Sequence, residues 1–202
     1  DVVSHLDSLE KSPVSLWWTY TRFPVTVLQV TYQLAYAKDV DDGRKAAAKV
    51  NAPGLNILFG DSKGNIAHWA AAKIPMYKPG MHTNLILDGS TGDNDIQGFY
   101  EFENNPNSEN PPSGILISSN NPPDSTHAGY FPGYYAPPYR FDRLTKLLGN
   151  NEKWSVEELK NISTDVFSDA HPVIAKFMMS VLAGDPLLQQ SKVHQQAAML
   201  LN

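Results

Sequence analysis

The strongest constraint on the fold is a β-hairpin predicted around residue 60. Two runs of β-forming residues, 55–60 and 65–70, flank the short segment Asp61-Ser62-Lys63-Gly64. Gly64 stands where a short loop requires a positive φ, which glycine adopts without a steric penalty. The chain is therefore expected to contain an antiparallel pair of strands whose register is well specified.

The residues before this hairpin predict one strand and two helices. Residues 13–19 alternate β-forming side chains, which predicts a strand. Apolar residues recur at three- and four-residue steps over 25–37, the period of an amphipathic helix. A second helix is expected over 43–50, with Asp41 or Asp42 as its N-cap.

The middle of the chain, residues 74–138, is rich in proline and glycine and is predicted to be mostly loops. One apolar run, 115–119, predicts a strand that ends at Asn120 and Asn121. A stretch this long with little regular structure is usually a binding region or a linker. Its many aromatic side chains favour packed loops.

Residues 139–202 have a helical pattern. Leucines spaced three and four apart predict one helix that is closed by Gly149-Asn150, and Ser155 with Glu158 forms a capping box at the start of another. Two more helices are expected over 172–182 and 187–201. The sequence therefore predicts an α+β protein in which a strand- and loop-rich part, 1–138, and a helical part, 139–202, form one structural unit.

Composition excludes several classes of function. The 202 residues carry a formal net charge of −5, which excludes a generally basic protein that neutralises nucleic-acid phosphates. There is no cysteine, so disulfides, thiolate metal sites and a cysteine nucleophile are excluded. The apolar runs are far shorter than the roughly 20 residues of a membrane-spanning helix, so we expect no membrane partner.

Metal-binding motifs are not evident. The six histidines lack the short spacings that build zinc sites: His5, His68, His82, His127, His171 and His194. The acidic segment 88–95 lacks the twelve-residue helix–loop–helix pattern of a calcium loop, so a solvated turn is the better interpretation.

Two features suggest chemistry, and each has an ordinary structural alternative. The Asn120 carboxamide, held before a proline pair, is a preorganised donor that could face a developing oxyanion, although an Asn-Asn-Pro sequence can simply be a turn. The aromatic residues Trp17, Trp18 and 134–139 could stack on a sugar or an aromatic acyl group, or they could fill a core.

Seven short segments, taken in their order and spacing, resemble a known family. They are Ser15-Leu16-Trp17-Trp18-Thr19, Asp61-Ser62-Lys63-Gly64-Asn65-Ile66, Lys73-Ile74-Pro75, Leu87-Asp88-Gly89, Asn110-Pro111-Pro112-Ser113-Gly114, Ser119-Asn120-Asn121-Pro122 and Tyr139-Arg140. Together they resemble the β-subunit of the penicillin acylase family, N-terminal-nucleophile (Ntn) amidohydrolases that include penicillin G, cephalosporin and acyl-homoserine lactone acylases. The resemblance implies part of a four-layer α/β/β/α Ntn-hydrolase fold.

The resemblance also implies roles for individual residues. The family's nucleophile is a Ser at the mature β-chain N-terminus, whose α-amino group acts as the general base. Asn120 matches the asparagine whose side chain holds the oxyanion, and Arg140 matches a supporting arginine near the active site. Leu55, just before Asn56, matches a residue that lines the acyl pocket, and Tyr32 falls near an aromatic pocket residue.

The chain also departs from the family pattern. Asp1 is not Ser, Thr or Cys, so we expect the nucleophile outside this chain. We interpret the chain as an internal fragment of the β-subunit that is inactive alone. The implied partners are a small-molecule amide substrate, the rest of the β-subunit and an α-subunit from the same precursor, and the implied location is periplasmic or secreted. Exposed sheet edges favour homo-oligomers.

No cofactor is expected for catalysis. The family's structural calcium uses an acidic residue in the loop that matches 129–131, and no acidic residue stands there. Asp124 is the nearest acidic residue that could substitute for it. Structural calcium is therefore expected for the family's complete enzymes, and we expect no metal site formed by this chain.

The rival hypothesis is a non-catalytic extracytoplasmic module that binds a glycan or peptide with its aromatic loops. Ligand-dependent protection of Trp17, Tyr134 and Tyr135 would favour that hypothesis. It accounts for the Pro- and Tyr-rich middle of the chain, but it leaves the ordered series of motifs unexplained.

Overall fold

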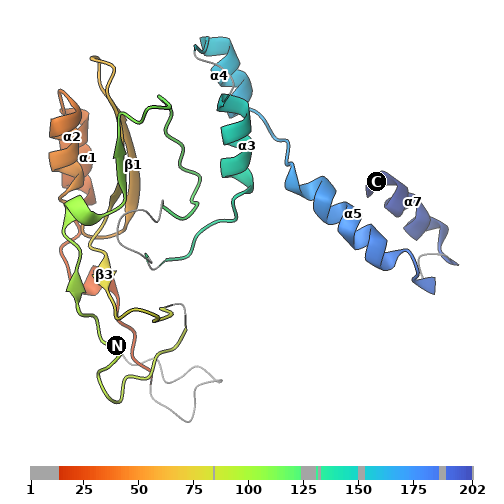
Figure 1. The fold of residues 1–202 in the computed structure, drawn as a ribbon, viewed down its shortest axis with the longest axis horizontal. Helices are drawn as coiled ribbons and strands as arrows, with labels where there is room; N and C mark the ends of the chain where they lie inside the picture. Colours follow the sequence, from red (N-terminus) through yellow and green to blue (C-terminus); the bar gives the residue numbers. More distant parts are fainter. Residues whose placement is uncertain are drawn as a thin grey trace. The chain divides into compact units, whose positions relative to one another are not determined.

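The computed structural model describes residues 14–83, 85–123, 131, 133–149, 153–186 and 190–201. The chain divides into two compact units (Figure 1). Asp1–Ser118 and Pro122–Tyr135 form the first, here called the sheet unit. Ser119–Asn121 and Ala136–Asn202 form the second, the helical unit. The expectation that a strand- and loop-rich part, 1–138, and a helical part, 139–202, form one structural unit stays a prediction.

The predicted hairpin is confirmed and forms the centre of the sheet unit. Strands β1 (Leu55–Gly60) and β2 (Ile66–Ala71) pair antiparallel, with Leu55 opposite Ala71 and Gly60 opposite Ile66. Gly64 has a φ of +90°, as the short loop requires. A third strand, β5 (Asn107–Glu109), pairs with β2 on its other side, so the order is β1-β2-β5.

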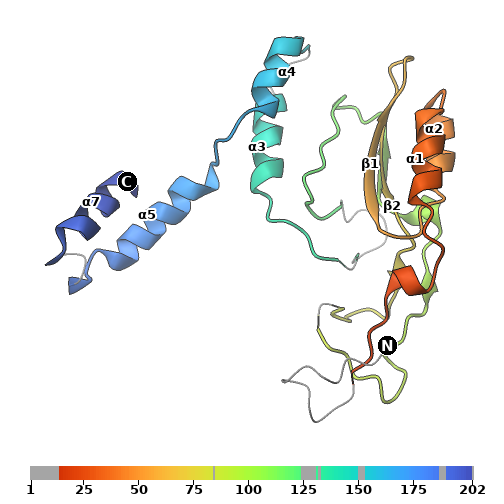
Figure 2. The same cartoon turned by 180° about the vertical axis from the view of Figure 1, so that it is seen from behind.

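Two helices cover one face of this sheet. Helices α1 (Val27–Ala35) and α2 (Val40–Ala47) lie on the same side of β1 and β2 (Figures 1 and 2). Alternate residues of β2 point toward them, and Trp69, at the centre, is only 1% exposed. The core contains Val30, Ala47, Val50, Ala67, Trp69 and Ala71. A Cβ on Gly43 would lie 3.2 Å from the Trp69 ring, so a small residue at this position lets α2 approach the indole closely.

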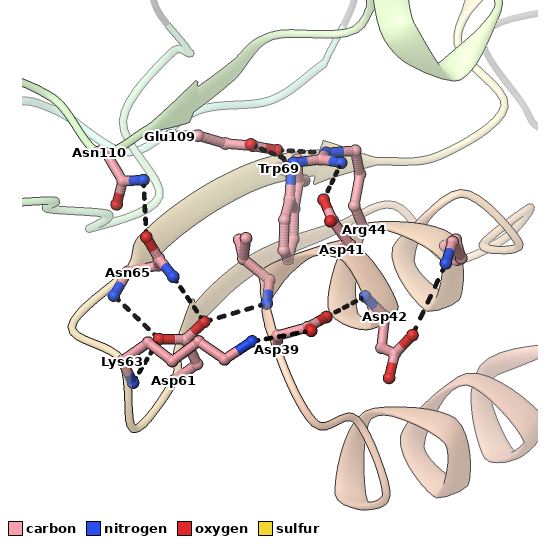
Figure 3. A network of polar contacts seen from close by, with 12 residues as sticks. Asp39, Asp41, Asp42, Arg44, Asp61, Lys63, Asn65, Trp69, Glu109 and Asn110 are labelled. Atoms are coloured by element: carbon pink, nitrogen blue, oxygen red, sulfur yellow. Dashed lines mark hydrogen bonds and ion pairs between the residues drawn. The ribbon is translucent and has the colours of Figure 1, made fainter.

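The main polar contact of the sheet unit is centred on Glu109, which accepts a hydrogen bond from the indole N–H of Trp69. Trp69 Nε1 donates to Glu109 Oε1 at 2.8 Å, and Arg44 Nε donates to the same oxygen at 2.6 Å (Figure 3). A second Arg44 nitrogen pairs with Glu109 Oε2, and Arg44 Nη1 lies 2.7 Å from Asp41. The Arg44 guanidinium therefore holds the pKa of Glu109 below its ordinary value. This contact joins α2, β2 and β5.

A second group of contacts ties the hairpin loop to the start of α2. Asp39 is the N-cap, and its side chain accepts a hydrogen bond from the Asp42 amide at 3.1 Å. The Lys63 ammonium lies 3.2 Å from the Asp39 carboxylate, and Asp61 accepts from the Val40 amide at 3.3 Å (Figure 3). The cap is thus Asp39 and not the predicted Asp41 or Asp42, because Asp39 alone has the extended backbone that a cap requires.

The remaining regular elements of the sheet unit are short. Strands β3 (Pro75–Met76) and β4 (Gly98–Phe99) form a two-stranded antiparallel sheet. Two 3-10 turns, η2 (Thr19–Thr21) and η3 (Phe102–Asn104), complete the described elements. The middle of the chain is thus mostly loops, as predicted.

The helical unit contains four helices among its described residues: α3 (Tyr139–Leu148), α4 (Val156–Ser163), α5 (Ala170–Leu182) and α7 (Lys192–Leu201). The capping box is confirmed, with Ser155 and Glu158 bonded reciprocally. Arg143 of α3 pairs with Asp165 at 2.7 Å, after α4. Leu187 and Asn150, which the sequence predicts in or beside helices, lie outside the described residues.

Two predicted strands are wrong. In the described part of 13–19, Ser15 makes only an isolated bridge, and the Trp18 carbonyl accepts from both the amide and the hydroxyl of Thr21, which turns the chain into η2. Residues 115–118 follow an irregular path without a sheet ladder. Both runs have strand-forming side chains, but a strand also needs a partner for its backbone groups.

The pairing of Glu109 predicts acid-sensitive stability. Because its pKa is lowered in the folded state, the pair stabilises the fold fully above the ordinary value near 4.5 and loses that contribution as pH falls through the lower folded value. Glu109→Gln should lower the free energy of unfolding at pH 7 by about 1–3 kcal/mol and flatten its dependence on pH below pH 5. Urea unfolding of the chain from pH 3 to 7 measures both effects. The exposed Glu101→Gln is the control, and acid sensitivity that persists in Glu109→Gln contradicts the assignment.

Candidate functional site

The candidate site of the helical unit is a short loop held against the start of a helix. Nη2 of Arg140, in the first turn of α3, donates to the Asn120 side-chain oxygen Oδ1 at 2.8 Å and to the Ser119 carbonyl at 2.8 Å. The Ala136 amide donates to the Asn120 carbonyl at 2.7 Å. The structure therefore brings together Asn120 and Arg140, the two residues that the resemblance implies in catalysis.

Asn120 has an unusual backbone conformation. Its φ of +58° lies in the left-handed region, which few residues other than glycine adopt, although asparagine tolerates it best. Such a conformation persists only where the surroundings hold it. Here the holding groups are Arg140 and Ala136, and not the end of a strand as predicted, because residues 115–118 form no strand.

The hydrogen bonds define which end of the Asn120 amide is available. Oδ1 accepts from the Arg140 cation, so the orientation of the carboxamide is defined and its Nδ2 remains a donor. Among the described residues, Asn120 Nδ2 donates no hydrogen bond, and Asn120 and Arg140 are exposed. The loop thus presents an N–H donor beside a guanidinium, a combination that suits an oxyanion.

The predicted pocket residues Leu55 and Asn56 are neighbours on β1, in the sheet unit, and face opposite ways. Leu55 is partly buried against the core on the side of α2. Asn56 is on the other face, where its Oδ1 lies 3.0 Å from Nε2 of His68 on β2. Consecutive residues of a strand point to opposite faces of the sheet, so Leu55 and Asn56 cannot both face the same side.

Tyr32 lies on the outer face of α1 in the same unit. Its side chain is 65% exposed, and its ring is 4.7 Å from the ring of Tyr36 one turn later. The core-facing positions of this helix are Val30 and Leu34. Leu28, at 87% exposure, precedes Tyr32 by one turn on the same face, so an apolar and aromatic stripe runs along α1.

The aromatic residues of the binding-module hypothesis have separate surroundings. Trp17 stacks on Phe99 with ring centroids 6.1 Å apart, and the Tyr135 hydroxyl donates to the Phe131 carbonyl at 3.2 Å. Tyr134 is fully exposed. Trp17 and Tyr135 therefore take part in packing or turn contacts, which agrees with a structural role for these aromatic residues.

In the part of the chain that the structure describes, no group of three or more His, Asp or Glu side chains could hold a metal ion. The carboxylate of Asp88 accepts from the Ser90 amide, and Lys78 pairs with Asp93 at 2.9 Å and lowers its pKa. Asp124, the nearest candidate for a calcium ligand, lies outside the described residues. Over the same described part, no helix combines the length and apolar character that a bilayer crossing needs.

Sequence reasoning missed two polar groupings of the sheet unit. The Arg44–Glu109 pair links residues 65 positions apart, and no short-range pattern signals it. The His68–Asn56 contact spans 12 positions. It could have been found from the hairpin register, because residues two positions off the direct pair lie diagonally across two strands.

Comparison with known proteins decides the family. The family model for penicillin amidase matches residues 2–202. The chain belongs to the penicillin amidase family. The penicillin acylase 2 proenzyme of Pseudomonas sp. (strain SE83) is 28% identical to this chain over 114 residues, which cover 56% of this chain and 15% of that protein.

A solved structure has a similar fold. The thermostable penicillin G acylase from Alcaligenes faecalis matches 89% of this chain and 35% of its own chain, with a TM-score of 0.64 and 19% sequence identity. This likeness supports the predicted α+β class. The chain thus spans only a minor part of the length of these two penicillin acylases.

The role of Arg140 as the clamp of the loop is testable in the chain itself. Arg140→Gln should raise the hydrogen-exchange rate of the Ala136 amide about tenfold, because the loop that accepts its hydrogen bond loses two contacts. Site-resolved exchange by NMR measures this rate. Arg143→Gln, three residues along the same helix, should instead release the Asp165 region and leave Ala136 unchanged. Equal protection of Ala136 in Arg140→Gln and wild type would refute the clamp.

Proposed function

We propose that this chain forms part of an amide hydrolase of the penicillin acylase type, in which Asn120 stabilises the oxyanion. The observation that carries the proposal is the Asn120 carboxamide, whose oxygen is bonded to Arg140 at 2.8 Å so that the amide nitrogen is presented. Membership of the penicillin amidase family supports the reaction class. Arg140 acts as a positioning residue, since its contacts are to the loop.

The proposed reaction proceeds through an acyl-enzyme. An N-terminal Ser hydroxyl, outside residues 1–202, loses its proton to its own α-amino group and attacks the carbonyl carbon of the substrate amide. The carbonyl oxygen becomes negatively charged, and the Asn120 N–H donates to it. The amine leaves after it receives the proton, and water then hydrolyses the acyl-enzyme by the same steps.

The orientation of the Asn120 amide matters for this role. A carboxamide that is free to rotate presents its oxygen as often as its nitrogen, and the oxygen would repel the developing charge. The Arg140 contact removes that rotation before the substrate binds, so no reorganisation is needed as charge develops. The cation also adds a favourable field for a negative charge.

The resemblance places Leu55, Asn56 and Tyr32 on the acyl side of the substrate. Leu55 and Asn56 face opposite sides of β1 and Tyr32 lies on the outer face of α1, so we propose that at most one of the three contacts the acyl group. The partners of the proposal are the rest of the β-subunit and an α-subunit from the same precursor, in the periplasm or outside the cell. The name of the Pseudomonas relative, a proenzyme, supports processing of a precursor.

Loss of the oxyanion donor tests the assignment of Asn120. In the full-length protein that contains this chain, Asn120→Ala should lower kcat for amide hydrolysis about 10²- to 10³-fold and change KM little. Asn120→Asp should lower kcat at least as much, because a carboxylate repels the oxyanion. Steady-state kinetics on a chromogenic amide gives both constants, with the exposed Asn104→Ala as the control. Wild-type kcat in Asn120→Ala would disprove the role.

The 202-residue chain alone should not hydrolyse amides. The nucleophile of the proposed reaction is not among its residues, and the remaining groups cannot replace the proximity that a bound nucleophile supplies. The same chromogenic amide, incubated with the purified chain and with buffer, provides the measurement. Turnover above the buffer rate that Asn120→Ala abolishes would show that the nucleophile lies within the chain and overturn this part of the proposal.

A further inference from the structure

Both backbone groups of Ser119, the residue before Asn120, are held by side chains. The Ser119 amide donates to Oδ1 of Asn121 at 2.9 Å, and the Ser119 carbonyl accepts from Nη2 of Arg140 at 2.8 Å. Ser119 is only 6% exposed, so its backbone groups need hydrogen-bond partners within the protein. All of these residues belong to the helical unit.

These contacts hold three successive peptide planes. The Ser119 amide, the Ser119 carbonyl and the Asn120 carbonyl belong to planes that follow one another along the chain. Their partners are Asn121, Arg140 and Ala136, in that order. The backbone angles φ and ψ of Asn120 relate the second plane to the third. Asn121 holds the first plane, and with it the direction from which the chain enters the turn.

The side chain of Asn121 reaches back past Asn120, so its contact with Ser119 depends on a sharp turn between them. Asn120 makes this turn with a φ of +58°, in the left-handed region that is unfavourable for residues with a Cβ. Pro122 follows, and a residue before proline is biased toward extended backbone, which reduces the freedom of Asn121. The Asn121 contact therefore offsets part of the cost of the Asn120 conformation.

We propose that Asn121 is a positioning residue for the oxyanion donor. Its Oδ1 holds the Ser119 amide, and this contact keeps Asn120 in the left-handed conformation that directs its carboxamide to Arg140. The inference rests on the proposed function for the role of Asn120. Asn121 itself touches neither the substrate nor the oxyanion and acts through Asn120.

Kinetics of the full-length protein tests this assignment. Asn121→Ala should lower kcat for the chromogenic amide about five- to tenfold, the factor expected from one hydrogen bond, and change KM by less than about twofold. Asn121→Asp, which keeps an acceptor oxygen, should recover most of the lost kcat. Asn161→Ala, at an exposed position of α4, is the matched control. Wild-type kcat in Asn121→Ala, or equal losses in the Ala and Asp variants, overturns the proposal.

A double-mutant cycle shows whether Asn121 acts through Asn120. Once Asn120→Ala has removed the donor, adding Asn121→Ala should lower kcat by less than about twofold, because no carboxamide remains to be positioned. A further loss as large as that of Asn121→Ala alone overturns the proposal. Wild-type kcat in Asn120→Ala means instead that the proposed function fails. A loss in Asn120→Ala with none in Asn121→Ala refutes the role of Asn121 alone.

Hydrogen exchange of the same variants supplies a readout that does not need turnover. Mass spectrometry of peptides that contain residues 117–121 should show that Asn121→Ala raises the exchange rate of the Ser119 amide about tenfold, whereas Asn121→Asp keeps it protected. Unchanged exchange over α4 shows that the variants are folded. If Asn121→Ala does not fold, Asn121→Leu, which has a similar branched shape and no acceptor oxygen, replaces it in each experiment. A Ser119 amide that stays protected without the acceptor refutes the assignment of Asn121.

Discussion

The sheet unit depends on the burial of one indole. Trp69 is almost fully buried between α2 and the sheet, and its buried N–H needs an acceptor. Glu109 supplies that acceptor from β5, and a carboxylate in this position needs a cation, which Arg44 supplies from α2. Burial of the Trp69 ring thus requires a series of polar contacts that joins helix α2 to strands β2 and β5. The alternation of inward and outward residues along β2, which places Trp69 inside, also fixes the hairpin register.

The proposed oxyanion donor follows a simple physical pattern. The side-chain amide of Asn120 is oriented because its oxygen already accepts a hydrogen bond from Arg140. The nitrogen is then a donor of known direction, and no energy is spent on turning it when a ligand arrives. An asparagine alone has no such preference, so the second residue matters as much as the first.

Much of the fold was predictable because it depends on residues a few positions apart. The Gly64 turn, the period of α1 and the Ser155 capping box are local patterns, and all three are confirmed. The strands predicted over 13–19 and 115–119 are wrong for the opposite reason. Their side chains favour strands, but among the described residues neither run forms a ladder with a neighbouring strand, and pairing is a property of the fold and not of the segment.

The amino-acid sequence by itself determined the hairpin, the helices and the order of motifs that indicates the penicillin amidase family, since each is written in neighbouring residues. Tertiary structure alone decided that Glu109 meets Arg44 across 65 positions, and that Arg140 bonds Asn120 across 20. It also decided that Leu55 and Asn56 serve opposite faces of one strand. Such contacts form only when folding brings distant segments together, so no pattern within a short stretch of sequence records them.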